Sequence, residues 1–196
     1  MRPRKNNMIP QELIEKAKKF AYIQTEKYKA PSLFQVEFTN EKGRWLAEEF
    51  GADKDIVLLG TLLMDCMIGV AIQEGRREKH VEMSEDKTRE LLSEFSDLDK
   101  EVRENIIWCI KQHHGADKFY SLESEICCNA DCYRFVSVKG VLGGIKFYRE
   151  APLKDIVNLY LEKADGKWQA LTLDICKKEL EPQYRAVKFF LGSYRE

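Results

Sequence analysis

A long apolar run that ends in a carboxylate places the strongest constraint on how this chain can fold. Residues 57–64 read VLLGTLLM, and Asp65 follows directly. Because the run is apolar on nearly every side, it predicts a buried helix at the centre of the molecule, over about residues 53–67. Burying the carboxylate of Asp65 is costly unless a cation or hydrogen bonds offset its lost hydration. The sequence therefore predicts a compensated charge inside a helical core.

Apolar residues recur at helical spacing along most of the chain, and no stretch alternates in the manner of a strand. We therefore predict an all-α fold, a single compact multi-helix domain over residues 1–196, with a core at about 30–136 and a C-terminal helical extension at about 144–196. The other helices are expected over residues 10–29, 33–50, 84–95, 99–113, 122–136, 152–171 and 174–191.

Charged segments, glycines and prolines predict where these helices are interrupted. Residues 69–79 are charged and irregular and predict a loop, and Ser84 is a candidate cap for the helix that follows. Three glycines, Gly140, Gly143 and Gly144, are expected to loosen the helical pattern. Pro182 is expected to kink or divide the last helix, because proline removes a backbone donor.

The composition excludes several classes of protein. Lys+Arg 32 against Asp+Glu 33 gives a net charge of -1, which argues against a general nucleic-acid binder. No run approaches the length of a membrane span, and no secretory signal follows the basic start, so we expect a cytoplasmic protein with no membrane partner. The six cysteines are then expected to be reduced thiols.

Histidine is rare in this chain, and each copy lies where a metal site could use it. His80, His113 and His114 fall between Asp65 and Asp131 in the sequence. Imidazole and carboxylate together suit Mn, Fe, Ni or Zn, so the pattern is the skeleton of a helical metal site.

Each of these residues also has a purely structural explanation. The two carboxylates could pair with basic residues such as Arg134. His80 lies in a charged segment typical of an exposed loop, and the macrodipole favours histidine at the helix end occupied by His113 and His114. Of two adjacent helical residues, only one readily faces a given side, so both alternatives stay open.

Three stretches, taken in order, resemble the HD-domain superfamily of metal-dependent phosphohydrolases. They are WLAEEFGAD at 45–53 with LLMD at 62–65, IIWCIKQHHG at 106–115, and LESEI at 122–126 leading to NAD at 129–131. The likeness covers residues 30–136, and the tail around KW at 167–168 and ELEP at 179–182 is similar to helical extensions of some members.

The resemblance implies a site in which two expected ligands are replaced. The family's early histidine falls on Gln35 and the histidine of its His-Asp pair falls on Met64, which leaves Asp65 and Asp131 as strong ligands of the primary ion. This chain is thus identified as a divergent member with a degenerate primary site.

The ligands of a second ion, found in some members of the superfamily, correspond to Asp65, His80, His113 and His114. The implied cofactor is one divalent transition metal, Mn, Fe, Ni or Zn, with a metal-free protein as the alternative. The proximity of Lys111 and Arg134 to the expected pocket makes them candidates to contact a phosphate.

Two functions follow from this resemblance. The first is a hydrolase of a small phosphoester, with a nucleotide as one candidate, in which Asp65 and Asp131 are catalytic and Asp131 orients water or acts as base. The second is a catalytically inactive HD-fold module that binds a phosphorylated ligand or a protein partner. Loss of both primary histidines favours the second, and the matching second site favours the first.

Overall fold

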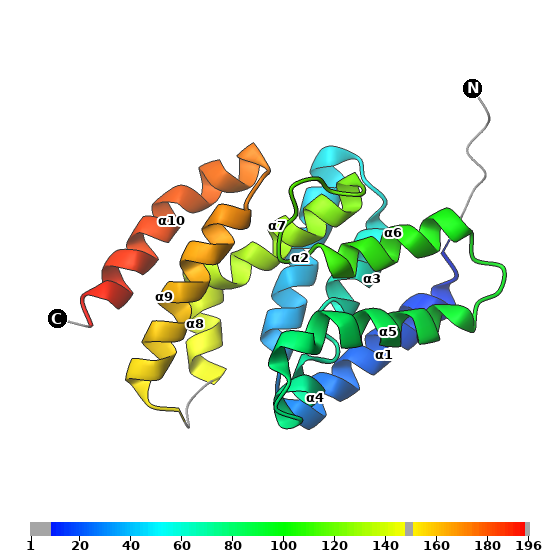
Figure 1. The fold of residues 1–196 in the computed structure, drawn as a ribbon. Coiled ribbons are helices and arrows are strands. Elements are labelled where there is room, and N and C mark those ends of the chain that lie inside the picture. Colours follow the sequence, from blue (N-terminus) through cyan, green and yellow to red (C-terminus); the bar gives the residue numbers. More distant parts are fainter. Residues whose placement is uncertain (1–8, 148–150, 195–196) are drawn as a thin grey trace.

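The computed structural model describes residues 9–147 and 151–194, and every regular element in these ranges is a helix (Figure 1). The all-α prediction is confirmed. The helices are α1 Gln11–Tyr28, α2 Leu33–Phe50, α3 Lys54–Leu63, α4 Ile68–Gln73, α5 His80–Ser93, α6 Lys100–Lys111, α7 Leu122–Val136, α8 Val138–Phe147, α9 Leu153–Ala170 and α10 Asp174–Gly192, with a 3₁₀ turn at Arg77–Lys79.

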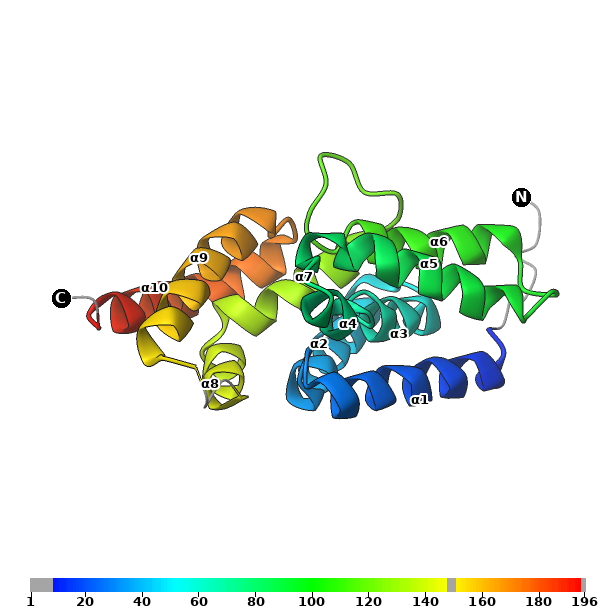
Figure 2. The same ribbon diagram turned by 60° about the horizontal axis from the view of Figure 1, so that its bottom comes forward.

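Helix α7 runs between two groups of helices. In both views α8, α9 and α10 lie on one side of it, and α1, α3, α4, α5 and α6 lie on the other (Figures 1 and 2). The larger hydrophobic cluster fills the space among α1, α2, α3, α6 and α7, and a smaller one, which includes Tyr160 and Leu191, joins α8, α9 and α10. Because α7 contacts both groups, residues on its buried face can meet side chains from either.

Polar side chains at the helix starts fix where the elements begin. Ser32 and Gln35 form a reciprocal capping box at α2, and Asp53 accepts two backbone N–H groups at the start of α3. Asp99 caps α6, and Ser121 with Ser124 forms a second capping box at α7. These caps satisfy backbone donors that a helix start otherwise leaves without partners.

The central apolar helix is shorter than the sequence predicts. Helix α3 ends at Leu63, and Asp65 lies in a turn before α4 begins at Ile68. Two successive backbone bonds of the tight i→i+3 type, Cys66 N–H to Leu63 and Ile68 N–H to Asp65, form this turn. The turn carries Asp65 out of the helical row, where its carboxylate meets α7.

The predicted loop at residues 69–79 is wrong in its first half. The chain there forms α4 and a 3₁₀ turn that leads directly into α5 at His80. Ser84 is therefore buried inside α5 rather than capping it, and its hydroxyl accepts the Met67 backbone N–H at the start of α4. The charged residues of this segment, at positions 74–79, lie in a turn and the 3₁₀ turn, and α4 is formed by the uncharged residues 68–73. The sequence pattern did not separate this short helix from the charged turn that follows it.

Glycine was a misleading signal in the C-terminal part, and proline did not divide the last helix. Residues 138–147 form regular helix α8, in which Gly140 and Gly144 allow close approach to the Tyr133 carbonyl and the Tyr160 side chain. Helix α10 continues through Pro182 rather than dividing there. The glycines therefore serve packing between helices, which a local pattern does not reveal.

One stretch, Lys54–Gln73, is long and apolar enough to cross a membrane by length and composition alone. It is 67% buried inside the fold and is interrupted by the turn at Asp65. The stretch is therefore a core segment of the described fold.

Gly60 on α3 tests how tightly the core that positions Asp65 is packed. A Cβ atom added there would lie 2.6 Å from Cys109 Cβ and 2.6 Å from Cys127 Sγ, on α6 and α7. We expect Gly60→Ala to lower the free energy of unfolding by about 1–3 kcal/mol through overpacking. Urea titration measures this change.

The matched control is Gly166→Ala on α9, where an added Cβ meets nothing within 4 Å. It should raise stability by up to about 1 kcal/mol, because alanine favours a helix over glycine. A Gly60→Ala protein as stable as this control would contradict the packing described here.

Candidate functional site

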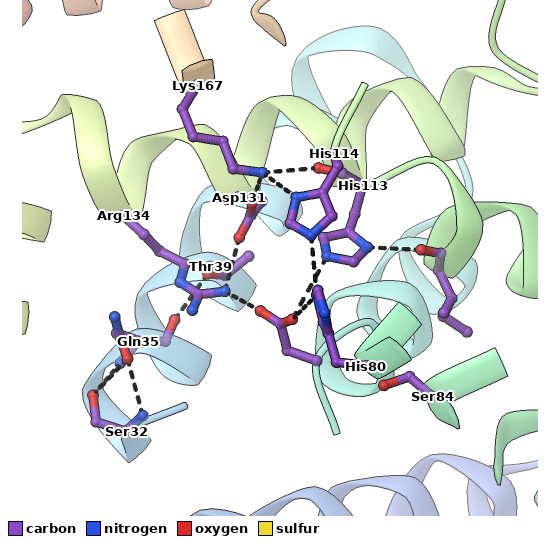
Figure 3. Close-up of polar contacts among 12 residues, drawn as sticks. Ser32, Gln35, Thr39, His80, Ser84, His113, His114, Asp131, Arg134 and Lys167 are labelled. Carbon is purple, nitrogen blue, oxygen red and sulfur yellow. Dashed lines mark hydrogen bonds and ion pairs between the residues drawn. The ribbon is translucent and has the colours of Figure 1, made fainter. Parts of the chain in front are cut away.

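Four segments that are distant in the sequence meet at the buried face of α7. Asp65 comes from the turn after α3, and His80 is the first residue of α5. His113 and His114 follow the end of α6, and Lys167 reaches across from α9 (Figure 3). Asp131 and Arg134, one turn apart on α7, lie between them.

Two buried carboxylates share one guanidinium nitrogen. Arg134 Nη1 donates to Asp65 Oδ2 at 2.5 Å and to Asp131 Oδ1 at 2.8 Å. The second oxygen of Asp131 forms an ion pair with Lys167 Nζ. All four side chains are buried, so two negative charges are balanced by two positive charges with little help from solvent.

This pairing keeps both carboxylates ionised. Burial alone would raise the pKa of Asp65, but the Arg134 charge and the His113 imidazole hold it well below its ordinary value. Burial would likewise raise the pKa of Asp131, and Lys167 and Arg134 lower it instead. Lys167 itself has a raised pKa because the pull of Asp131 outweighs its desolvation.

The three imidazoles form a cluster beside this network. One ring nitrogen from each of His80, His113 and His114 lies within 4.8 Å of the other two. His80 Nε2 is 3.4 Å and His113 Nε2 is 3.6 Å from Asp65 Oδ1, the oxygen that Arg134 does not use. Asp65 therefore joins the charge network to the imidazole cluster.

Hydrogen bonds to backbone carbonyls set the tautomers of two rings. His80 Nδ1 lies 2.7 Å from the Arg77 carbonyl oxygen, and His113 Nδ1 lies 2.7 Å from that of Ile110. A carbonyl only accepts, so each Nδ1 carries the proton and each neutral ring presents a bare Nε2. Both bare nitrogens face Asp65 Oδ1, which gives three acceptors turned toward one another.

Two of these acceptors have no hydrogen-bond partner. Within the described residues, Asp65 Oδ1 and His113 Nε2 are buried and accept no hydrogen bond. Unpartnered buried acceptors are unfavourable, and a cation between them relieves the cost. The donor set of imidazole and carboxylate therefore fits a divalent transition metal.

His114 has a different environment from its neighbour. Lys167 Nζ donates to His114 Nδ1 at 2.9 Å and to the His113 carbonyl oxygen at 3.3 Å. With Nδ1 accepting, a neutral His114 carries its proton on Nε2, which lies 3.0 Å from His80 Nε2 and donates to it. His114 is therefore a hydrogen-bond donor in this arrangement and lacks the bare Nε2 of a ligand.

Desolvation favours the neutral form of two rings of the cluster. Desolvation lowers the pKa of His80, and this outweighs the opposite pull of Asp65. Desolvation lowers the pKa of His114 as well, and the neighbouring His113 and Lys167 add to the effect. Neutral imidazoles are the form that binds metal.

No family model matches the sequence, and no curated protein matches it in sequence. Solved structures match it closely in fold. A predicted HD superfamily hydrolase from an uncultured Thermotogales bacterium aligns over 95% of this chain and 97% of its own, with a TM-score of 0.65 and 17% identity. An HD-superfamily hydrolase from Bacillus thuringiensis covers 94% and 96%, with a TM-score of 0.60 and 20% identity. Bacillus subtilis YpgQ, solved in complex with ADP, covers 93% of each chain, with a TM-score of 0.61 and 15% identity.

The chain has an HD-domain-like fold. The structure shows what stands at the positions where the sequence places the primary HD histidines. Gln35 is buried, and its Oε1 accepts the Ser32 backbone N–H at 3.0 Å as part of the cap of α2. Met64 is buried and offers only a thioether. Since Asp65 and Asp131 are already paired with Arg134, these residues do not fit the primary metal ion of an HD site.

The remaining candidates lie as follows. Lys111 Nζ, predicted to contact phosphate, pairs with Glu85 at 3.1 Å on the surface. Arg134 is buried against the two aspartates. The catalytic, metal-binding and substrate-binding roles expected from the sequence stay predictions, although the structure brings Asp65, His80, His113, His114, Asp131 and Arg134 into one region of the HD-like fold.

Sequence reasoning missed the contribution of α9. Lys167 shares a buried face with Tyr160 and Ala164, and a lysine at helical spacing within an apolar stripe is the signal that could have revealed it. Lys163, one turn earlier, is half-buried, and desolvation lowers its pKa, with the charges of Arg77 and Lys167 adding to the effect. Neither Lys163 nor Arg77 has an anionic side-chain partner among the described residues. Together they give the region a positive outer edge.

Acid should weaken the buried charge network. The carboxyl pKa values of Asp65 and Asp131 lie below that of an unfolded aspartate, about 3.9. Their contribution to stability is therefore complete above about pH 5 and is lost as pH falls toward the folded values. Asp131→Asn should cost about 3–5 kcal/mol near pH 7 by unpairing buried cations, and the gap from the parent should narrow near pH 4.

Urea unfolding of chelator-treated parent and variant at the two pH values measures this gap. Asp117→Asn removes an exposed carboxylate in the loop after α6 and is the matched control. It should show a smaller gap than Asp131→Asn at both pH values. An Asp131→Asn gap that stays constant or widens on acidification would contradict the assignment.

Proposed function

We propose that the protein is a divergent HD-type phosphohydrolase that uses one divalent transition metal held by His80, His113 and Asp65. The observation that carries this proposal is the set of three facing acceptors, His80 Nε2, His113 Nε2 and Asp65 Oδ1, two of which are buried without a hydrogen-bond partner among the described residues. Nothing in an ordinary ion-pair network requires three acceptors to face one another.

A divalent ion held there supplies positive charge that polarises a phosphoryl oxygen and activates water. The chain's own residues prepare the site. The carbonyls of Arg77 and Ile110 hold the protons of His80 and His113 on Nδ1, which leaves Nε2 bare. Arg134 keeps Asp65 ionised and fixes the direction of its other oxygen.

His114 and Lys167 have supporting roles in this proposal. Lys167 keeps the His114 proton on Nε2, so that ring offers a neutral N–H donor to a phosphoryl oxygen once His80 Nε2 is engaged elsewhere. Asp131 is a weak base, because Arg134 and Lys167 lower its pKa. We therefore propose that its role is to hold the side chains of Arg134 and Lys167 in place.

We further propose that the substrate is a small phosphoester, with a nucleotide as the leading candidate. Arg77 and Lys163 place positive charge at the outer edge of the imidazole cluster, which suits a phosphate. YpgQ, which shares the fold, was solved with ADP. Six free, buried cysteines are consistent with a reducing, cytoplasmic location.

Metal content tests the first part of the proposal. Protein purified without chelator should contain a transition metal, and His80→Ala and His113→Ala should each lower metal affinity by at least about tenfold, because each removes a ligand. His114→Ala is the matched comparison, since its ring lacks a bare Nε2, and it should retain most of the affinity. Titration calorimetry with Ni or Mn measures all four proteins.

Either of two results would contradict this assignment. One is a parent that takes up no transition metal under any loading condition. The other is a loss of metal affinity in His114→Ala together with unchanged metal affinity in His80→Ala. That result would mean that a different set of side chains holds the metal.

A specific observation also favours an alternative, an inactive HD-fold module that binds a phosphorylated ligand. Arg134 and Lys167 already neutralise the two carboxylates that would hold the primary ion. A site balanced by its own cations can bind an anion at its outer edge without performing chemistry. The two functions differ in whether ligand binding and phosphate release require metal.

Thermal shift with ADP separates the two functions. We expect ADP to raise the melting temperature of the parent, and Lys163→Ala to abolish most of the rise by removing an anion contact. Lys178→Ala, an exposed lysine on α10, is the control and should respond like the parent. Phosphate release that appears only with Ni or Mn supports the enzyme. An ADP shift of equal size in chelator, with no phosphate release under any metal, supports the module.

A further inference from the structure

The two central carboxylates of the HD-like fold enclose a cation that belongs to the protein itself. A single atom, Arg134 Nη1, lies within hydrogen-bond distance of both Asp65 and Asp131. That atom is located where one ion would bridge the two side chains. Figure 3 shows the Arg134 side chain beside Asp131 and directed toward the imidazole cluster.

We infer that the Arg134 guanidinium permanently replaces the metal ion between Asp65 and Asp131, so that no divalent cation bridges these two carboxylates in the folded protein. The inference concerns the carboxylate pair alone and does not rest on metal binding by the imidazole cluster.

The charge balance supports this inference. Asp65 and Asp131 carry two negative charges, and Arg134 and Lys167 carry two positive charges, all on buried side chains. A divalent ion placed between the two carboxylates would lie directly against the Arg134 charge that already occupies this position. A metal could enter only by displacing Arg134, which would then be buried without its partners.

The surrounding residues are consistent with a protein cation. Arg134 follows Asp131 by three residues on α7, so the two side chains share a helix face. Its second bond reaches Asp65 in the turn after α3, which ties two segments together as a bridging ion would. Gln35 uses its Oε1 for the cap of α2, and Met64 is buried, so neither offers a strong ligand for an ion at this position.

Removal of Arg134 should convert the pair into a cation site. We expect Arg134→Met, in chelator-treated protein, to lower the melting temperature by on the order of 10 °C, since two buried carboxylates lose a shared partner. Excess MgCl₂ should then restore about 5 °C or more, because an ion that binds only the folded state stabilises it. Mg²⁺ is the probe because it prefers oxygen ligands and binds imidazole only weakly.

Three comparisons make the test specific. The parent should show no Mg²⁺-dependent shift. Arg134→Lys keeps the positive charge and should show none either, with a melting temperature closer to the parent than that of Arg134→Met. The double variant Arg134→Met/Asp131→Asn removes one buried negative charge. In the absence of Mg²⁺ it should have a higher melting temperature than Arg134→Met, and added Mg²⁺ should not change that temperature.

Several outcomes would overturn the inference. One is an Arg134→Met protein as stable as the parent. Another is a destabilised Arg134→Met that gains nothing from Mg²⁺ and nothing from Asp131→Asn. The parent decides the question even where variants fail to fold. A Mg²⁺-dependent rise in the melting temperature of the parent overturns the inference, and the absence of that rise supports it. A parent without transition metal at the histidines would refute the function proposed above and leave this result unchanged.

Discussion

The shared hydrogen bonds of Arg134 to Asp65 and Asp131 connect the segments that form the candidate site. They join the turn after α3 to α7, and Lys167 extends the connection to α9. Since Arg134 takes only one oxygen of Asp65, the other is directed at His80 and His113. The orientation of the imidazole cluster therefore depends on a salt bridge that lies beside it.

A buried ion pair of this kind is weak evidence for stability but strong evidence for specificity of arrangement, which we take as a hypothesis for this protein. The backbone carbonyls of Arg77 and Ile110 fix the proton of two rings on Nδ1. Lys167 donates to Nδ1 of the third ring, so the proton of that ring is on Nε2. Two neighbouring histidines, His113 and His114, are thereby given different hydrogen-bonding characters. The fold thus distinguishes a ligand-like ring from a donor-like ring without any difference in residue type.

The fold was largely predictable from local patterns, and its exceptions have local causes. Helical spacing predicted the all-α class, and α2 has the bounds expected from its flanking residues. The prediction failed at residues 69–73 and 138–147, where neighbouring charge and glycine were interpreted as signs of irregular chain. A short helix that leads into a charged turn, and glycines at a helix contact, produce the same local composition as a loop, and only packing partners separate the cases.

The sequence by itself predicted a buried carboxylate at Asp65, and its resemblance to HD domains predicted an HD-like order of three histidines and the replacement of two primary histidines by Gln35 and Met64. It left open whether Asp65 would meet a metal or an arginine. Tertiary structure decided this, because Arg134 reaches Asp65 from 69 residues away and Lys167 reaches His114 from 53 residues away. The strength and direction of a buried charge interaction depend on distance and desolvation in three dimensions, which residue spacing does not encode.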